Sequence, residues 1–187
     1  MPCAKCRKDI KKAGATSVQL SLTIATRNNH RDCLNEIIKN NPEEPLDYEV
    51  MYEAIVEGHT DMVAYLISKG CSVDDAEMCD TAAHKDNIQI LQILNDNKCP
   101  RSANACAEAA AIGSLSTIMW LRDHDFPWDE MVYINGLYAR NMDILKYAHA
   151  HNCPISYKVF EFAKNSQNDV SKEAIEYLKE IKCPETA

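Results

Sequence analysis

The strongest constraint on the fold of this chain is an internal repeat. The stretch GHTDMVAYLISKGCSVD begins at Gly58, and related stretches begin at Asp86, Gly113 and Arg140, at spacings of 28, 27 and 27 residues. A weaker copy starts at Asn29 and another lies near the end of the chain, so the sequence contains about six copies. A fixed period of this length is typical of a solenoid, in which each unit buries its apolar face against its neighbours.

Each copy is predicted to form two short helices. The first helix is expected to follow a residue type that commonly caps helix N-termini, and the second carries apolar residues at helical spacing. The second helix is expected to end at a left-handed residue, a position held by Gly70, Lys98, Asp125 and Asn152. The predicted N-caps recur with the repeat period and are Asp47, Asp75, Ser102, Asp129 and Ser156.

We predict a basic N-terminal tail followed by one array of repeats. Residues 1–16 are polar and basic without a usable helical period, and residues 17–187 carry the repeated pattern. The approximate boundaries of the predicted repeats are 17–46, 47–74, 75–101, 102–128, 129–155 and 156–187.

Composition indicates the cellular setting. No apolar run approaches the ~20 residues that a membrane-spanning helix needs, and the first residues lack the apolar segment of a signal peptide. The nine cysteines are odd in number and no Asn-x-Ser/Thr sequon is present, which favours reduced thiols over a disulfide framework. We therefore expect a soluble, cytoplasmic protein, in the host cytoplasm if it is viral. Cys71, Cys99, Cys153 and Cys183 share one repeat position and are predicted to pack at the corner between helices.

The net charge of −8 is unevenly distributed. The first twelve residues carry +4, so the repeats carry about −12. An acidic array repels a phosphate backbone, and nucleic acid is therefore not an expected partner. The positive charge of the tail comes from Lys5, Arg7, Lys8, Lys11 and Lys12, opposed by Asp9.

The stretch AIVEGHTDMVAYLISKGCSVD, from Ala54 to Asp74, resembles the core of an ankyrin repeat, with its Gly-His turn, second helix and closing corner. Two features depart from that family: the Thr-Pro-Leu-His opening is absent, and the period is 27 or 28 residues instead of ~33. The missing residues fall where the family builds its β-hairpin. The resemblance therefore implies an all-α, ankyrin-like helical solenoid of about six short helix-turn-helix repeats with little or no β-hairpin. Short repeats of this kind are similar to arrays of large DNA viruses and protists.

The resemblance also implies a function. It predicts a non-enzymatic scaffold that binds a protein partner through the concave face formed by first helices and corners. We expect no cofactor, no nucleic acid and no membrane partner, and a monomer unless the chain belongs to an assembly. The alternative is a structural or assembly component of a larger particle, which large exposed apolar areas on both faces would favour. The predicted partner-binding residues are Tyr48, Glu53, Glu57, Asp80, His84, Lys85, Arg101, Trp128, Glu130, Tyr138 and Tyr157.

Trp128 stands in a short corner between Pro127 and Asp129. If it is exposed there, it would serve as an aromatic interface anchor; if it folds back, it would cover the core of its own repeat. The sequence leaves both interpretations open. No catalytic constellation, glycine-rich phosphate loop or HExxH motif is present, so enzymatic activity is not expected.

The sharpest chemical motif is Cys3-x-x-Cys6, which His30-x-x-Cys33 could complete as a four-ligand zinc site. However, His30 matches His59 at the Gly-His turn, and Cys33 falls on the apolar stripe of its repeat. Both residues thus have packing roles, and a closed tetrahedral site would need all four side chains to converge. We therefore predict no metal, keeping Cys3 and Cys6 as candidate ligands for a zinc-binding alternative.

Overall fold

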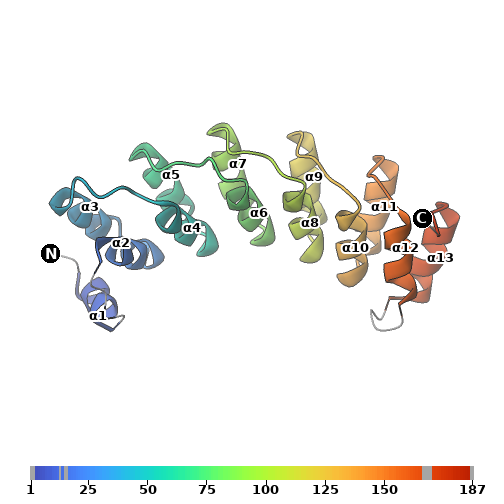
Figure 1. The fold of residues 1–187 in the computed structure, drawn as a ribbon, viewed down its shortest axis with the longest axis horizontal. Helices are drawn as coiled ribbons and strands as arrows, with labels where there is room; N and C mark the ends of the chain where they lie inside the picture. Colours follow the sequence, from blue (N-terminus) through green and yellow to red (C-terminus); the bar gives the residue numbers. More distant parts are fainter. Residues whose placement is uncertain (1–2, 13, 15–16, 166–169, 186–187) are drawn as a thin grey trace. The chain divides into compact units, whose positions relative to one another are not determined.

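The computed structural model describes residues 3–12, 14, 17–165 and 170–185, and these residues form thirteen α-helices and no strand. This confirms the predicted all-α class (Figure 1). The helices are α1 (Ala4–Lys12), α2 (Val18–Arg27), α3 (Arg31–Asn40), α4 (Tyr48–Val56), α5 (Thr60–Ser68), α6 (Glu77–His84), α7 (Ile88–Asp96), α8 (Asn104–Ala111), α9 (Leu115–Asp123), α10 (Met131–Tyr138), α11 (Met142–Ala150), α12 (Tyr157–Lys164) and α13 (Lys172–Glu180).

From α2 onward the helices alternate along the chain as first and second helices of six repeats. Helix α1 precedes them, inside the segment that the sequence indicates as a basic tail. Residues 1–2, 13 and 15–16 of that segment lie outside the described residues. None of the helices in the described part of the chain is both long and apolar enough to cross a bilayer.

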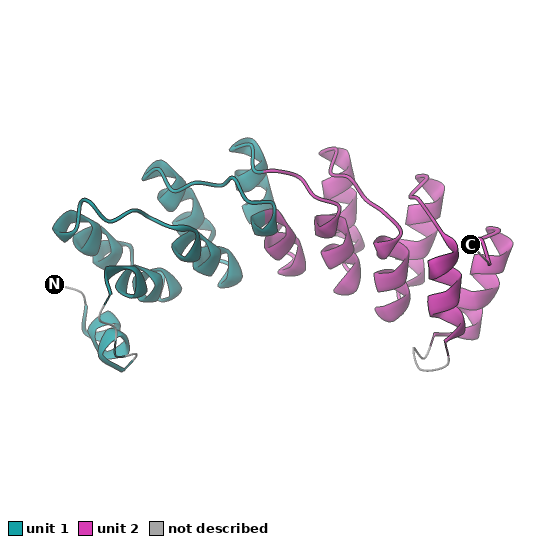
Figure 2. Cartoon of the chain, in the orientation of Figure 1, with its two compact units in different colours: residues 1–78, 89–99 teal, residues 79–88, 100–187 magenta. Residues whose placement is uncertain are grey.

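The chain divides into two compact units (Figure 2). Unit 1 comprises residues 1–78 and 89–99, and unit 2 comprises residues 79–88 and 100–187. Unit 1 contains helices α1 to α5, and unit 2 contains helices α8 to α13.

In the first five repeats, the turn from the first to the second helix contains one left-handed residue. At Gly58 and Gly113 this residue is a glycine, with φ of 71° and 75°, for which this conformation costs little. The other repeats place Asn29, Asp86 and Arg140 there, with φ between 53° and 55°. The second helices α5, α7, α9 and α11 also end on left-handed residues, at Gly70, Lys98, Asp125 and Asn152, as predicted.

Of the five predicted N-caps, two are confirmed and three are corrected, because the other three each lie two residues before the first residue of their helix. The side chains of Asp47 and Ser156 accept backbone N–H groups at the starts of α4 and α12. Asp75 and Asp129 still accept the backbone N–H of the first helical residue, Glu77 or Met131, although each lies one residue before the N-cap position. Ser102 is not a cap, because Ala103 holds that place and the Ser102 hydroxyl instead donates to Asp80.

The predicted corner role of the recurring cysteines is confirmed. Their side chains are at most 5% exposed. Each thiol reaches back to a backbone carbonyl just ahead of the first helix of its own repeat, as in Cys153 to Asp129, with an Sγ to O distance of 3.2 Å. Burial raises the pKa of Cys71 to about 11 and that of Cys153 to about 12, so these thiols stay protonated. The equivalent bonds elsewhere join Cys71 to Leu46, Cys99 to Asp75 and Cys183 to Ser156.

Small buried residues let the two helices of a repeat approach closely. The first helices place Ala54, Ala82, Ala109, Gly136 and Ala163 at equivalent positions. At Gly136 a Cβ atom would lie 2.9 Å from Leu145 Cδ1 and 3.0 Å from Ile144 Cγ2, so α11 packs directly on the α10 backbone. The core of each unit therefore combines apolar second-helix residues packed on small first-helix residues with larger buried first-helix side chains, such as Met51 and Phe160.

Candidate functional site

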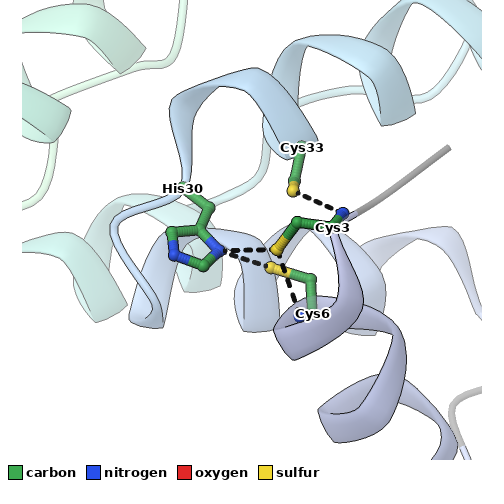
Figure 3. Close-up of side chains that lie close together, drawn as sticks. All are labelled: Cys3, Cys6, His30 and Cys33. Atoms are coloured by element: carbon green, nitrogen blue, oxygen red, sulfur yellow. Dashed lines mark hydrogen bonds between the residues drawn. The ribbon is translucent and has the colours of Figure 1, made fainter.

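Four potential metal ligands converge where α1 meets the start of α3 (Figure 3). Cys3 directly precedes α1, and Cys6 lies in its first turn. His30 is the N-cap of α3, and Cys33 lies in the first turn of that helix. Each Cys-x-x-Cys or His-x-x-Cys pair therefore spans one helical turn, which places its two side chains on the same side.

The ligand atoms of this cluster all lie within 4.8 Å of one another. His30 Nδ1 lies 3.0 Å from Cys3 Sγ and 3.1 Å from Cys6 Sγ. Cys6 and Cys33 are buried, whereas Cys3 and His30 are partly exposed. The four side chains thus converge as a closed zinc site requires, although the repeat pattern predicts packing roles for His30 and Cys33.

Each sulfur of the cluster lies within hydrogen-bonding distance of an N–H group. The backbone N–H of Cys3 donates to Cys33 Sγ at 3.1 Å, and that of Cys6 donates to Cys3 Sγ at 3.5 Å. The Asn28 amide nitrogen lies 3.9 Å from Cys6 Sγ and 3.0 Å from Asp9 Oδ2. The Cys6 N–H lowers the pKa of the Cys3 thiol, whereas burial raises the pKa of Cys6.

The predicted partner-binding residues of unit 1 lie on or beside α4. The Tyr48 hydroxyl donates to Glu77 at 3.1 Å, and burial together with this carboxylate raises the Tyr48 pKa. Glu53 forms an ion pair with Arg27 of the preceding repeat and raises the pKa of that guanidinium. Glu57, the C-cap of α4, is exposed. Two of the three predicted residues are thus engaged by neighbouring side chains.

Several charged residues predicted in unit 2 pair with a neighbouring repeat. His84 Nδ1 lies 2.8 Å from Glu108 Oε2, and Asp80 accepts from Ser102. Glu130 has its pKa lowered by hydrogen bonds from Ser156 and from Lys158, whose Nζ lies 3.1 Å away.

Two further cationic residues of the predicted set are exposed in unit 2. Lys85 directly follows α6, and the Arg101 guanidinium lies 5.5 Å from the centroid of the Phe126 ring. The predicted partner-binding residues of unit 2 therefore include both acidic and basic side chains.

The three predicted aromatic residues of unit 2 differ in exposure. Trp128 is half-buried, with its ring edge-on to Tyr147 at 6.1 Å and the Arg122 guanidinium 4.4 Å above it. It therefore packs over its own repeat and the next. Tyr157 is also half-buried, whereas Tyr138 is 73% exposed at the end of α10.

Sequence reasoning left two exposed apolar residues on the first helices of unit 2 out of the predicted set. Ile112 and Met131 are each 39% exposed, at the C-cap of α8 and the start of α10. A signal was available, because the positions equivalent to Met131 in the other repeats are polar and exposed. Those positions hold Glu49, Glu77, Asn104 and Lys158.

Comparison with known proteins supports the fold that these features indicate. No protein-family model and no curated protein matches the sequence. Among solved structures, the human ASB11 ankyrin repeat domain is similar, with a TM-score of 0.65 over 86% of this chain and 82% of that one. The chain has an ankyrin-like repeat fold. At 14% identity the likeness concerns the fold alone, so the ankyrin-like helical solenoid predicted from the repeat is confirmed without a shared partner being implied.

Proposed function

We propose that this ankyrin-like chain binds a protein partner through the first-helix surface of unit 2, defined by Ile112, Met131 and Tyr138. The observation that best supports this proposal is that Tyr138, a large aromatic side chain at the end of α10, is 73% exposed. Tyrosine is enriched among interface residues that contribute most to binding, because it buries a large area and orders few torsions. An array of this fold supports protein binding in general, and the exposed apolar residues supply its local anchor.

The distribution of exposed apolar residues supports this choice of surface. Among the described residues, the most exposed large apolar side chains are Leu20, Ile112, Met119, Met131 and Tyr138. Of these, only Met119 lies on a second helix. Apolar area exposed on the second helices would favour the alternative, a structural component that packs through both faces. Met119 alone does not supply such an area, because single exposed apolar residues are ordinary on protein surfaces.

The charges around this surface indicate the chemistry of the partner. The His84–Glu108 and Lys158–Glu130 pairs contribute side chains of both signs to the first helices of unit 2. Lys85, which follows His84 in the chain, and Arg140, two residues after Tyr138, are exposed. A rim of mixed charge favours a partner with an apolar pocket and mixed polar surroundings. We place this interaction in a reducing compartment such as the cytoplasm, a choice supported by nine free cysteines.

Site-specific photocrosslinking tests this proposal. A photoreactive phenylalanine analogue is introduced at Tyr138 in one variant and at Met119 in a matched control, and each chain is expressed in cells of the native source. The expected result is a discrete protein adduct from position 138 that is absent from position 119. Tyr138→Ala, combined with Ile112→Ser, should weaken capture of that protein at least about tenfold, since interface anchors typically contribute 2 kcal/mol or more.

Adducts from position 119 alone, or equal capture by the Tyr138→Ala/Ile112→Ser variant and the unmodified chain, would contradict the proposal. Trp128 is left unchanged in these variants. Because it packs on Tyr147 and Arg122, its replacement would disturb the fold as well as the surface.

A further inference from the structure

The contacts of His30 cannot all be satisfied by hydrogen bonds. Its Nδ1 atom is approached by two sulfurs, from Cys3 at 3.0 Å and Cys6 at 3.1 Å. An imidazole nitrogen carries either one N–H group or one lone pair, so it forms one well-directed hydrogen bond. A cation between these atoms would resolve the conflict, because the nitrogen and the sulfurs would all direct lone pairs at it.

We propose that Cys3, Cys6, His30 and Cys33 bind one zinc ion, which fastens α1 to the first repeat. Three cysteines and one histidine form a standard closed structural zinc site. With Zn–S bonds of ~2.3 Å and a Zn–N bond of ~2.0 Å, tetrahedral geometry separates the ligand atoms by about 3.5–3.8 Å. The four ligand atoms already lie within 4.8 Å of one another, so adjustments of roughly half an ångström complete the site.

The surroundings of the sulfurs suit thiolates bound to a metal. Each of the three sulfurs faces one N–H group, from the backbone of Cys3, the backbone of Cys6 or the Asn28 amide. Such outer donors orient metal ligands and offset the charge of thiolates. Any thiol still protonated releases its proton to solvent when zinc binds. The basic residues of α1 further offset the excess negative charge of three thiolates around a divalent ion.

Helix α1 lacks the apolar packing that would otherwise hold it. Among its nine residues only Cys6 is buried, and its other side chains are mostly charged. A helix of this length is marginal in water without tertiary support. Four metal bonds would supply that support, because the binding free energy of a structural zinc ion is also folding free energy. The site also has an entry path, since Cys3, His30 and Cys33 line an open depression with Asn29 and Arg31.

The compactness of the ligand set favours one ion over a larger centre. A two-iron cluster would hold its two ligand pairs further apart, because two metal atoms and bridging sulfides lie between them. Sulfur-rich tetrahedral sites select zinc over magnesium or calcium, which prefer oxygen ligands. A single zinc ion therefore matches both the ligand types and their spacing.

Metal analysis of the purified full chain tests the proposal. The chain is prepared under reducing conditions from zinc-supplemented cells, without chelator, and its metal content is measured by inductively coupled plasma mass spectrometry. One zinc per chain is expected for the unmodified protein. Cys6→Ser/Cys33→Ser should lose more than about nine-tenths of it, because two of four ligands are removed. Cys71→Ser/Cys153→Ser, two buried corner thiols, is the matched control and should retain one zinc per chain.

Cobalt supplies a readout that does not depend on the behaviour of the variants. Zinc-stripped, reduced protein is titrated with Co²⁺, and thiolate-to-cobalt charge-transfer bands together with strong tetrahedral ligand-field bands are expected at one equivalent and should disappear when zinc is added. Two results would overturn the proposal: a fully reduced chain that takes up neither metal, or a Cys6→Ser/Cys33→Ser variant that keeps its zinc. Iron with absorption typical of iron–sulfur clusters would overturn the choice of a single zinc ion.

Discussion

Helices α3 and α11 begin with the same arrangement but differ at two positions. In α11 the N-cap is Asn141, whose side chain accepts the N–H groups of Asp143 and Ile144, and Ile144 is fully buried against Gly136. In α3 the N-cap is His30, which makes no side-chain capping bond, and the place of Ile144 is taken by Cys33. The two positions that hold a capping residue and a core residue in the later repeat thus hold potential metal ligands, His30 and Cys33, in the first repeat.

The difference follows from what each repeat packs against. The Asn141 amide donates to the Gly113 carbonyl of the preceding repeat, and His59 contacts the Arg27 carbonyl in the same way. The N-cap side chain therefore faces the preceding turn. In the repeat formed by α2 and α3, the N-cap side chain of His30 faces α1 instead, through Cys3 and Cys6. The N-cap position, which joins repeat to repeat at Asn141, therefore faces α1 in the case of His30 and is available as a ligand position.

The largest effect that separates the two regions is expected on removal of metal. Stripping zinc should raise amide hydrogen exchange in α1 by at least about 100-fold, because a short polar helix without its anchor is close to unfolded. Exchange in α10 and α11 should remain unchanged, since apolar packing holds them. Hydrogen exchange read by mass spectrometry measures both regions in one sample.

The control for this experiment is Cys6→Ser/Cys33→Ser, on which the chelator should have no effect. If α1 remains protected in the stripped protein, polar contacts such as Asn28 to Asp9 suffice to hold it, and the contrast between the two regions fails.

The counterpart test acts on the apolar side of the comparison. Ile144→Ala should lower the free energy of unfolding by about 3 kcal/mol, because it removes buried methyl groups and leaves a cavity beside Gly136. Urea denaturation followed by circular dichroism measures the loss. Ile144→Val, which removes one methylene, should cost about 1 kcal/mol. Equal losses in the free energy of unfolding for the two variants would contradict this prediction, because they would mean that neighbouring side chains fill the cavity left by Ile144→Ala.

Periodicity predicts the fold of this chain well because each repeat restates the same physical requirements. The left-handed positions at Gly70, Lys98, Asp125 and Asn152 and the corner cysteines recur with the apolar stripe, so each copy supports the interpretation of the others. The prediction fails where one copy departs from the rest. Ser102 has a good capping side chain, but Asp80 of the preceding repeat accepts its hydroxyl proton, and a contact between repeats is invisible to a local pattern.

The candidate sites are less predictable for the same reason. Aligning the repeats assigns His30 and Cys33 to the roles of their counterparts, yet the first copy has a different neighbour in α1. The position of α1 depends on tertiary contacts of a helix without an apolar pattern, which periodicity cannot supply. Exposure is likewise set by neighbours: Trp128 and Tyr138 look similar as surface aromatics in the sequence, but only Tyr138 is largely exposed.

The corner thiol of Cys153 predicts a pH dependence of the free energy of unfolding. Burial raises the pKa of Cys153 from 9.0 to about 12. Between these values the unfolded chain loses the thiol proton and the folded chain keeps it, so the stability from this group is complete below about pH 9 and falls as pH rises. Cys153→Ser should be less stable than the unmodified chain at pH 8, and the difference should shrink by up to about 1.4 kcal/mol per pH unit above pH 9.

Urea midpoints at pH 8, 9 and 10 in reducing buffer measure this trend. Cys153→Ala provides the control, because it also lacks an ionisable group and should show the same slope with a different offset. A difference that stays constant with pH would mean that the thiol has an ordinary pKa in the folded chain.

The smallest effect comes from making the first repeat resemble the later one. His30→Asn/Cys33→Ile supplies α3 with the cap and core residue of α11. In the presence of chelator, this variant should stabilise the α2–α3 pair by about 1 kcal/mol, because asparagine accepts N–H groups that His30 leaves without a side-chain cap. Exchange of the first α3 amides should slow accordingly, while α1 stays unprotected even with zinc. If α1 is instead protected in this variant, the two regions are held in the same way, by packing rather than by ligands.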